Sequence, residues 1–290
     1  MSIVISVKTR DGIVLAANSL TAYLDSGTLP PRKLFNNAHR IFDLSDGTPL
    51  AAVAFGIGGV GSNSVATLSS LLCDRLRNES NARGWIPGSR TVARVAEQAR
   101  ALFFEDVYLK AYPQPWAEFK MGYRICGFSG NMPSPQIWEF QIEGAICRGP
   151  YEVQAGGECG VRWAGDVDVL DRLLLGPQGG VRTALLERGY SAAEVQGLYA
   201  EIIARLGGES EARLTSMEGA AGTAKFLAEL APSLLTPGPK TQAREFMEIA
   251  AVTREQGFHW IQRREASVSA TQAPGAPPPL APNEGGSANP

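Results

Sequence analysis

The fold class is decided by the opening stretch Ser2-Ile-Val-Ile-Ser-Val-Lys-Thr-Arg-Asp-Gly-Ile-Val-Leu-Ala-Ala-Asn18. Two apolar runs rich in Val and Ile flank the pair Asp11-Gly12, a composition typical of a β-hairpin turn. Further along, the apolar runs 40–44 and 49–55 flank the turn residues 45–48 in the same way. The chain is therefore predicted to begin with two β-hairpins.

After Gly56 the spacing of apolar residues changes from a strand pattern to a helical one. We expect one helix from about Val60 to Arg77 and a second helix over residues 92–103. The buried face of the first helix is predicted to carry Val60, Val65, Leu68, Leu71, Leu72 and Leu76. Four strands are thus followed by two helices.

The second half of the sequence returns to strands and then to helices. Strands are predicted at 119–128, 136–142 and 145–148, and helices throughout 166–235, with a capping box formed by Ser191 and Glu194. A closing hairpin is expected to pair 246–253 with 258–262. This order predicts antiparallel sheets with helices on their outer faces, a layered α+β architecture.

The composition argues against several classes of partner. The 290 residues include 27 Lys and Arg against 29 Asp and Glu, and the net charge of -2 provides no basic surface for nucleic acid. No apolar run reaches the roughly 18 residues that cross a bilayer. Residues 1–8 also lack the basic and apolar regions of a signal peptide. We therefore expect a cytoplasmic protein that binds neither nucleic acid nor membrane.

Residues 1–265 are predicted to form one domain, and residues 266–290 a disordered tail rich in Pro, Ala and Gly. The tail holds six of the 19 prolines and no Lys or Arg, so it cannot bury enough apolar surface to become ordered. The chain has only two histidines, and its cysteines, at Cys73, Cys126, Cys147 and Cys159, lack metal-ligand spacing. We expect four buried cysteines, no metal and no cofactor.

One glycine-rich motif has two interpretations. Residues 56–61 read Gly-Ile-Gly-Gly-Val-Gly, the pattern of a dinucleotide-binding loop between a strand and a helix. That unit also needs a parallel strand after the helix, whereas the sequence beyond Arg77 predicts another helix. We favour the alternative, a glycine-rich corner that permits close packing.

The start of the chain carries a second candidate motif. Removal of Met1 would leave Ser2 with a hydroxyl group and a free α-amine on one residue. An α-amine has an unperturbed pKa of about 7.7 to 8.0, which suits a general base at neutral pH. An N-terminal amine beside a hydroxyl is an established arrangement for an activated nucleophile. Ser2 is therefore a candidate nucleophile.

The opening stretch resembles the start of proteasome β-type subunits and related N-terminal nucleophile hydrolases. In that family a mature Thr or Ser precedes a short apolar strand, an Asp-Gly or Gly-Gly turn and a second strand, and Ser2 falls on the nucleophile position without a gap. Phe55-Gly56 resembles the segment with the family's oxyanion-hole glycine, and residues 125–128 resemble the strand after its helix pair. The resemblance covers about the first 150 residues.

This resemblance implies a four-layer αββα sandwich of two antiparallel sheets, the N-terminal nucleophile hydrolase fold, over residues 1–265. It also implies that the Ser2 hydroxyl attacks a carbonyl, that the Ser2 amine moves the proton, and that the Gly56 N–H stabilises the oxyanion. The family's aspartate at the end of the second strand is Asn18 here. Its lysine has two candidates, Lys33 by distance from the start and Arg40 by the register of the strand that follows.

Near the C-terminal hairpin the family carries an Asp and a Ser that support the amine. The looser match in this region puts Lys240 and Ala243 in their places, with Asp166 and Asp168 as candidate substitutes. The expected function is hydrolysis of peptide or other amide bonds through Ser2, in a homo-oligomer whose closed form would be a ring. The alternative is a noncatalytic scaffold subunit of the same fold, and a dinucleotide-binding domain using residues 56–61 is a more distant one.

Overall fold

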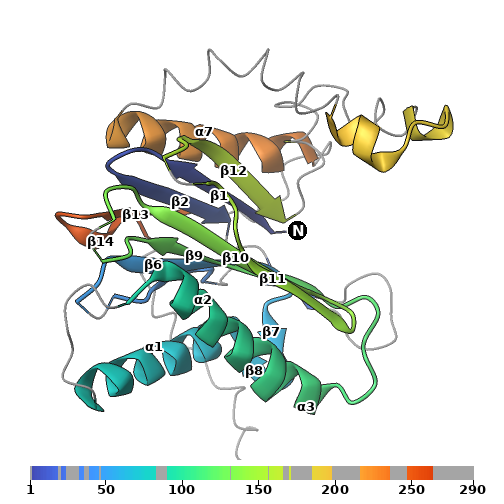
Figure 1. Ribbon diagram of the computed structural model, residues 1–290, viewed down its shortest axis with the longest axis horizontal. Helices are drawn as coiled ribbons and strands as arrows, with labels where there is room; N and C mark the ends of the chain where they lie inside the picture. The colour runs from blue at the N-terminus through green and yellow to red at the C-terminus, as the bar shows by residue number, and fades with distance from the viewer. Residues whose placement is uncertain are drawn as a thin grey trace, which may run out of the picture.

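Two five-stranded antiparallel sheets are stacked face to face in the computed structural model (Figure 1). The structure describes residues 2–18, 21–23, 33–35, 39–45, 47–82, 90–130, 132–155, 157–165, 170, 185–197, 216–235 and 247–263. Within these ranges the chain is a mixed α+β protein, as the order of sequence patterns predicts. Residues 266–290 lie outside the described part of the chain.

The first sheet has the strand order β12-β1-β2-β13-β14. It is built from β1 (Ile3–Lys8), β2 (Gly12–Asn18), β12 (Gly160–Gly165), β13 (Met247–Thr253) and β14 (Gly257–Gln262). The predicted turn closes the β1–β2 hairpin, and the hydroxyl of Thr9 accepts hydrogen bonds from the backbone N–H groups of Asp11 and Gly12. Both predicted hairpins in this sheet are confirmed, whereas β12 is a strand that the sequence analysis missed.

The second sheet has the order β11-β10-β9-β6-β5. Its strands are β5 (Ile41–Asp43), β6 (Leu50–Gly56), β9 (Lys120–Gly127), β10 (Gln136–Glu143) and β11 (Ile146–Glu152), all close to their predicted positions. Two small hairpins lie outside the sheets, β3 (Thr21–Tyr23) with β4 (Lys33–Phe35) and β7 (Gly59–Val60) with β8 (Asn63–Ser64).

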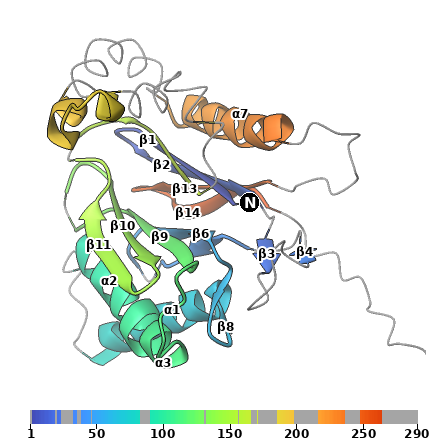
Figure 2. The same ribbon diagram turned by 90° about the vertical axis from the view of Figure 1, so that its right-hand side faces the viewer.

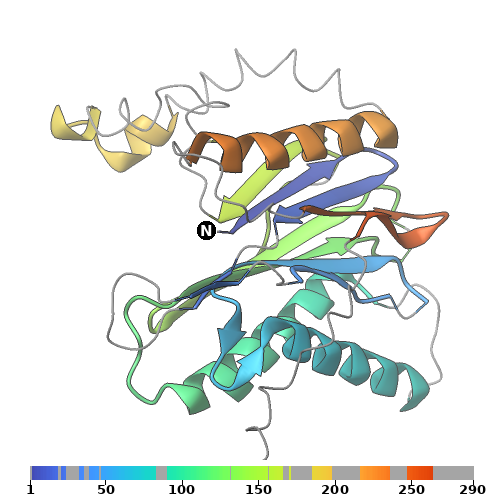
Figure 3. The same ribbon diagram turned by 180° about the vertical axis from the view of Figure 1, so that it is seen from behind.

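Helices cover the outer faces of both sheets (Figures 1 and 3). The second sheet is covered by α1 (Val65–Ala82) and α2 (Val92–Arg100), and α2 continues as a π-helix (η1, Ala101–Tyr108) into α3 (Leu109–Ala111). The first sheet is covered by α7 (Met217–Leu235), which packs on β1, β2 and β13. Helix, sheet, sheet and helix thus form four successive layers.

The first helix begins later than the sequence predicts. Val60 belongs to β7, and α1 starts at Val65, where the Ser64 hydroxyl accepts a hydrogen bond from the N–H of Thr67 and caps the helix. Leu71 is 44% exposed and therefore lies off the predicted buried face. The other capping prediction is confirmed, because Ser191 and Glu194 bond each other's backbone N–H groups.

The alternation of side chains between the two faces of β1 shows which face Ser2 is on. Ile3, Ile5 and Val7 pack under α7, while Val4 belongs to the apolar cluster between the two sheets. Side chains two residues apart share a face of a strand, so Ser2 precedes β1 on the side that faces the second sheet. Figure 2 shows that the chain enters the first sheet at the start of β1, at one end of that sheet.

Candidate functional site

Ser2 and Gly56 meet where the two sheets approach each other. Ser2 precedes β1 of the first sheet, and Gly56 ends β6 of the second. Ser2 is buried, and its Oγ accepts a hydrogen bond of 2.7 Å from the Gly56 N–H. The predicted nucleophile and the predicted oxyanion donor are therefore in direct contact, although 54 residues separate them in sequence.

The edge of β6 explains why the Gly56 N–H is available to Ser2. The N–H of Ala54 donates to the carbonyl of Arg40, just before β5, whereas Gly56 lies two residues beyond that contact. Backbone donors two residues apart point to the same side of a strand, so the Gly56 N–H extends past the end of β5. Gly56 also has a φ of +81°, and a Cβ there would collide with the Lys120 carbonyl, so the position requires glycine.

Asn18 fixes the backbone immediately after Ser2. This residue ends β2 and is buried, and its Oδ1 accepts a hydrogen bond of 2.9 Å from the N–H of Ile3. An aspartate could accept the same bond, but Asn18 adds no negative charge. Its observed role is to position the start of β1.

Arg40 is the candidate cation that the structure places at this site. Its guanidinium Nη1 lies 3.4 Å from the carbonyl oxygen of Ala54 and 3.5 Å from that of Gly56. Gly56 thus contacts Ser2 through its N–H and Arg40 through its carbonyl. Burial lowers the pKa of Arg40 to about 10, an effect that the nearby Glu248 carboxylate opposes. Arg40 therefore remains positively charged at neutral pH.

Lys33, the other candidate cation, lies in the β3–β4 hairpin, where its backbone pairs with Tyr23. Its side chain is outside the described part of the structure. Lys240, Ala243, Asp166 and Asp168 likewise fall outside the described residues, so their predicted roles stay predictions.

Glu248 is a site residue that the sequence analysis missed. It lies in β13, is 2% exposed, and accepts a 3.3 Å hydrogen bond from the backbone N–H of Arg40. Its other carboxylate oxygen lies 2.6 Å from Nδ1 of His39. One signal could have found it: a single acid stands inside the apolar run Met247-Glu-Ile-Ala-Ala-Val252, and a charge in a buried strand needs a partner.

Gly165 brings a third strand to the site. It is the antiparallel partner of Ile3 on β12, and a Cβ at Gly165 would collide with the Ser2 carbonyl. Its φ of +102° also favours glycine. Two glycines, Gly56 and Gly165, therefore allow the backbone to close around Ser2.

The described residues contain no group of three or more His, Cys, Asp or Glu side chains that could hold a metal ion. Cys73 and Cys126 are buried as expected, but Cys147 and Cys159 are only partly buried, which corrects the prediction for these two. Cys147 lies on β11, an edge strand whose side chains are mostly accessible, and Cys159 directly precedes β12, the edge strand of the other sheet.

The arrangement around residues 56–61 does not match a dinucleotide-binding unit. Both neighbours of β6, the strands β5 and β9, are antiparallel to it. The glycine-rich segment forms the small β7–β8 hairpin, which leads directly into α1. The motif is therefore a tight corner between a strand and a helix.

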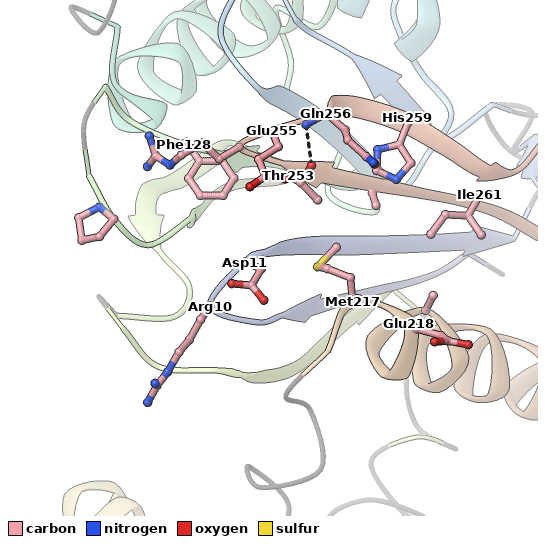
Figure 4. Close-up of a pocket in the computed structure, with 14 residues that line it drawn as sticks. Arg10, Asp11, Phe128, Met217, Glu218, Thr253, Glu255, Gln256, His259 and Ile261 are labelled. Carbon is pink, nitrogen blue, oxygen red and sulfur yellow. Dashed lines mark hydrogen bonds between the residues drawn. The ribbon is translucent and has the colours of Figure 1, made fainter.

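A pocket of about 870 Å³ lies at the other end of the first sheet, around the β1–β2 and β13–β14 turns (Figure 4). Its lining includes Asp11, Met217, Glu255 and His259. Ser2 and Asp11 stand at opposite ends of the β1–β2 hairpin, so this pocket is separate from the Ser2 site.

No family model matches this sequence, and a search of curated proteins found no match. None of the described helices is both long enough and apolar enough to span a bilayer.

Proposed function

We propose that the protein is an N-terminal nucleophile hydrolase that cleaves peptide or other amide bonds through Ser2 after Met1 has been removed. The observation that carries this proposal is the 2.7 Å hydrogen bond from the Gly56 N–H to Ser2 Oγ. The two-sheet sandwich with outer helices is the architecture expected for that fold, and the resemblance of residues 2–18 supports the same assignment.

The reaction requires only groups that Ser2 and its neighbours supply. The Ser2 α-amine takes the hydroxyl proton while Oγ forms a bond to the substrate carbonyl carbon, and the carbonyl oxygen gains the negative charge near the Gly56 N–H. When the intermediate collapses, the C–N bond breaks and the leaving amine takes the proton from the α-ammonium group. Water, activated by the same amine, then hydrolyses the Ser2 ester and regenerates both groups.

Arg40 supplies a fixed positive charge to this scheme. Its pKa of about 10 keeps it protonated at neutral pH, so it cannot act as the base. A positive charge within about 4 to 6 Å disfavours protonation of an amine and lowers its pKa. In this scheme the Ser2 α-amine is the base, and the Arg40 charge, which contacts the carbonyl of the same Gly56 that binds Ser2, helps to keep the amine deprotonated.

A noncatalytic scaffold subunit is the second candidate. Asn18, in place of the family's aspartate, is the observation that favours it, because the buried site then lacks one negative charge. Under this alternative the contact between Ser2 and Gly56 is structural, and no amide bond is cleaved.

Intact mass spectrometry combined with a covalent probe tests the proposal. We expect the purified protein to lack Met1 and to react with a peptide epoxyketone, which bonds both the hydroxyl and the amine of one residue. Ser2→Ala should abolish labelling, whereas Ser70→Ala, which changes an exposed serine on α1, should label normally. A retained Met1, or labelling that survives Ser2→Ala, would contradict the proposal.

A further inference from the structure

Glu248 carries a buried charge whose two oxygens are both directed toward residues just before β5. Oε2 accepts the hydrogen bond from the Arg40 N–H, and Oε1 lies 2.6 Å from His39 Nδ1. The side chain of His39 is 49% exposed, while that of Glu248 is 3% exposed. Burial of a carboxylate costs free energy unless it is paired. The contacts with Arg40 and His39 provide that pairing for Glu248.

The register of β13 directs Glu248 toward the space between the sheets. Ala250 and Val252, two and four residues further along, belong to the apolar cluster between the sheets, and side chains two residues apart share a face. Glu248 pairs with Ala17, the residue before Asn18, in β2. The carboxylate thus enters the inter-sheet layer at the same end as Ser2.

Three hydrogen bonds connect Glu248 to the nucleophile. Glu248 binds the backbone of Arg40, the Arg40 side chain reaches the Gly56 carbonyl, and the Gly56 N–H binds Ser2 Oγ. Each step is a hydrogen bond between buried or half-buried groups. A shift of Glu248 would therefore move both the site cation and the oxyanion donor.

We infer that Glu248, held by His39, is a positioning residue that sets the place of Arg40, and through Arg40 the charge and geometry around Ser2. This inference rests on the proposed function. Glu248 does not touch substrate in this scheme. It supplies the counter-charge of Arg40 in the inter-sheet layer and, together with Arg40, determines the net charge near the Ser2 amine.

Glu248→Gln is the variant that separates this role from simple stabilisation. Glutamine has the same size and can still accept from the Arg40 N–H, but it removes the negative charge. Since less negative charge then faces the Ser2 amine, the amine pKa should fall, and the acidic limb of the pH profile for probe labelling should move to lower pH. Because a neutral amide no longer attracts the Arg40 guanidinium, the Arg40 side chain should be held less firmly, and the maximal labelling rate should fall about 10-fold to 100-fold.

The amine pKa can be measured without any activity, by trace acetylation with acetic anhydride over a pH series and mass spectrometry of the N-terminal peptide. Glu248→Asp, which keeps the charge, should retain the parent amine pKa, and Glu255→Gln, at the exposed β13–β14 turn, should change neither pKa nor rate. His39→Gln should reduce the labelling rate in the same direction as Glu248→Gln.

Two failures can be distinguished by these measurements. If the parent protein labels at Ser2 and Glu248→Gln shows the same amine pKa and rate, the inference about Glu248 is wrong and the proposed function stands. If the parent protein never labels, the proposed function fails. Even when the parent protein does not label, the amine pKa can be compared. If folded Glu248→Gln and the parent protein have the same Ser2 amine pKa, the inference about Glu248 is wrong.

Discussion

In the proposed mechanism, Arg40 takes the place that the family resemblance gives to a lysine, and this changes what the cation can do. Arg40 stays charged at neutral pH, so its removal should act through electrostatics and not through proton transfer. We expect Arg40→Ala to raise the pKa of the Ser2 amine, because a like charge is lost, and to shift the acidic limb of the pH–rate profile upward. Near neutral pH the rate of probe labelling should fall about 10²-fold.

Two companion variants decide between the candidate cations. Arg40→Lys keeps the charge and should retain much of the labelling rate, while Lys33→Ala should have a small effect. The same pH series measures all three proteins. If Lys33→Ala is the damaging substitution and Arg40→Ala is mild, the charge that acts on Ser2 belongs to Lys33.

Asn18 is expected to act through position. In Asn18→Ala the buried N–H of Ile3 loses its acceptor, which should cost about 1–3 kcal/mol of unfolding free energy. The labelling rate should fall as well, because the backbone that carries Ser2 is no longer fixed. Asn18→Asp can accept the same bond, and urea denaturation with a labelling assay compares the two variants. Equal stability of Asn18→Ala and the parent protein would mean that this hydrogen bond contributes little.

Among single residues, Ser2 and Gly56 are predicted through the family resemblance, because each has a definite place next to a hairpin that the sequence shows. The sequence leaves the choice between Lys33 and Arg40 open. Counting residues from the start of the chain selects Lys33, whereas aligning the strand that follows selects Arg40. Glu248 escapes prediction because its partners, His39 and Arg40, are more than 200 residues away and only the folded sheets bring them together.

Among the strands, a buried ion pair lies between the two sheets. Arg124 of β9 is 2.6 Å from Glu139 of β10, and it also donates to the hydroxyl of Ser6 on β1, in the other sheet. Arg124→Ala would leave Glu139 buried without its counter-charge and should destabilise the protein by about 3–5 kcal/mol. Urea denaturation measures this loss.

The paired substitution Arg124→Met with Glu139→Leu is the control for that measurement. It removes both charges and fills a similar volume, so it should be much less destabilising than Arg124→Ala alone. A double variant as unstable as the single one would show that the hydrogen bonds lost with the pair, to Ser6, Gln141 and Tyr151, matter more than the charge balance.

Some strands and helix ends can be predicted from the sequence more easily than others. The strands of the β1–β2 and β5–β6 hairpins are local, so apolar runs around turn residues are enough to find them. Strand β12 has only six residues, of which the first and the last are glycines, and its pairing with β1 is long-range. The start of α1 was predicted too early because Val60 fits the helical spacing, although the Ser64 cap fixes the first turn.

For the whole molecule, the order of strands within each sheet could not be derived from periodicity. Local sequence patterns predict hairpins between neighbouring strands. Strand β13, however, pairs with β2 although the two are far apart in the sequence, and this pairing places Glu248 beside Ala17. The candidate site depends on such pairings, since Ser2, Gly56, Gly165 and Glu248 come from four strands or strand ends. The sequence therefore predicts the parts of the site better than their assembly.

Assembly is a property that the family resemblance implies for the whole chain. Large apolar side chains are exposed on helices of both outer layers, including Leu71 on α1 and Phe226 on α7. We expect a homo-oligomer, closed into a ring if the contacts are heterologous. Light scattering over a wide concentration range measures the mass, and a monomer at every concentration would refute the expectation.

Removal of residues 266–290 should leave this assembly and the fold unchanged. The buried residues of all three apolar clusters fall between Ile3 and Val252, so a chain that ends at Glu265 keeps every one of them. The composition of the removed segment also predicts that it buries little apolar surface. The shortened chain should therefore show the parent melting temperature, the parent mass per particle and the parent labelling rate at Ser2. A lower melting temperature, or dissociation of an oligomer that the full chain forms, would instead assign these 25 C-terminal residues a place in the core or at the subunit contact.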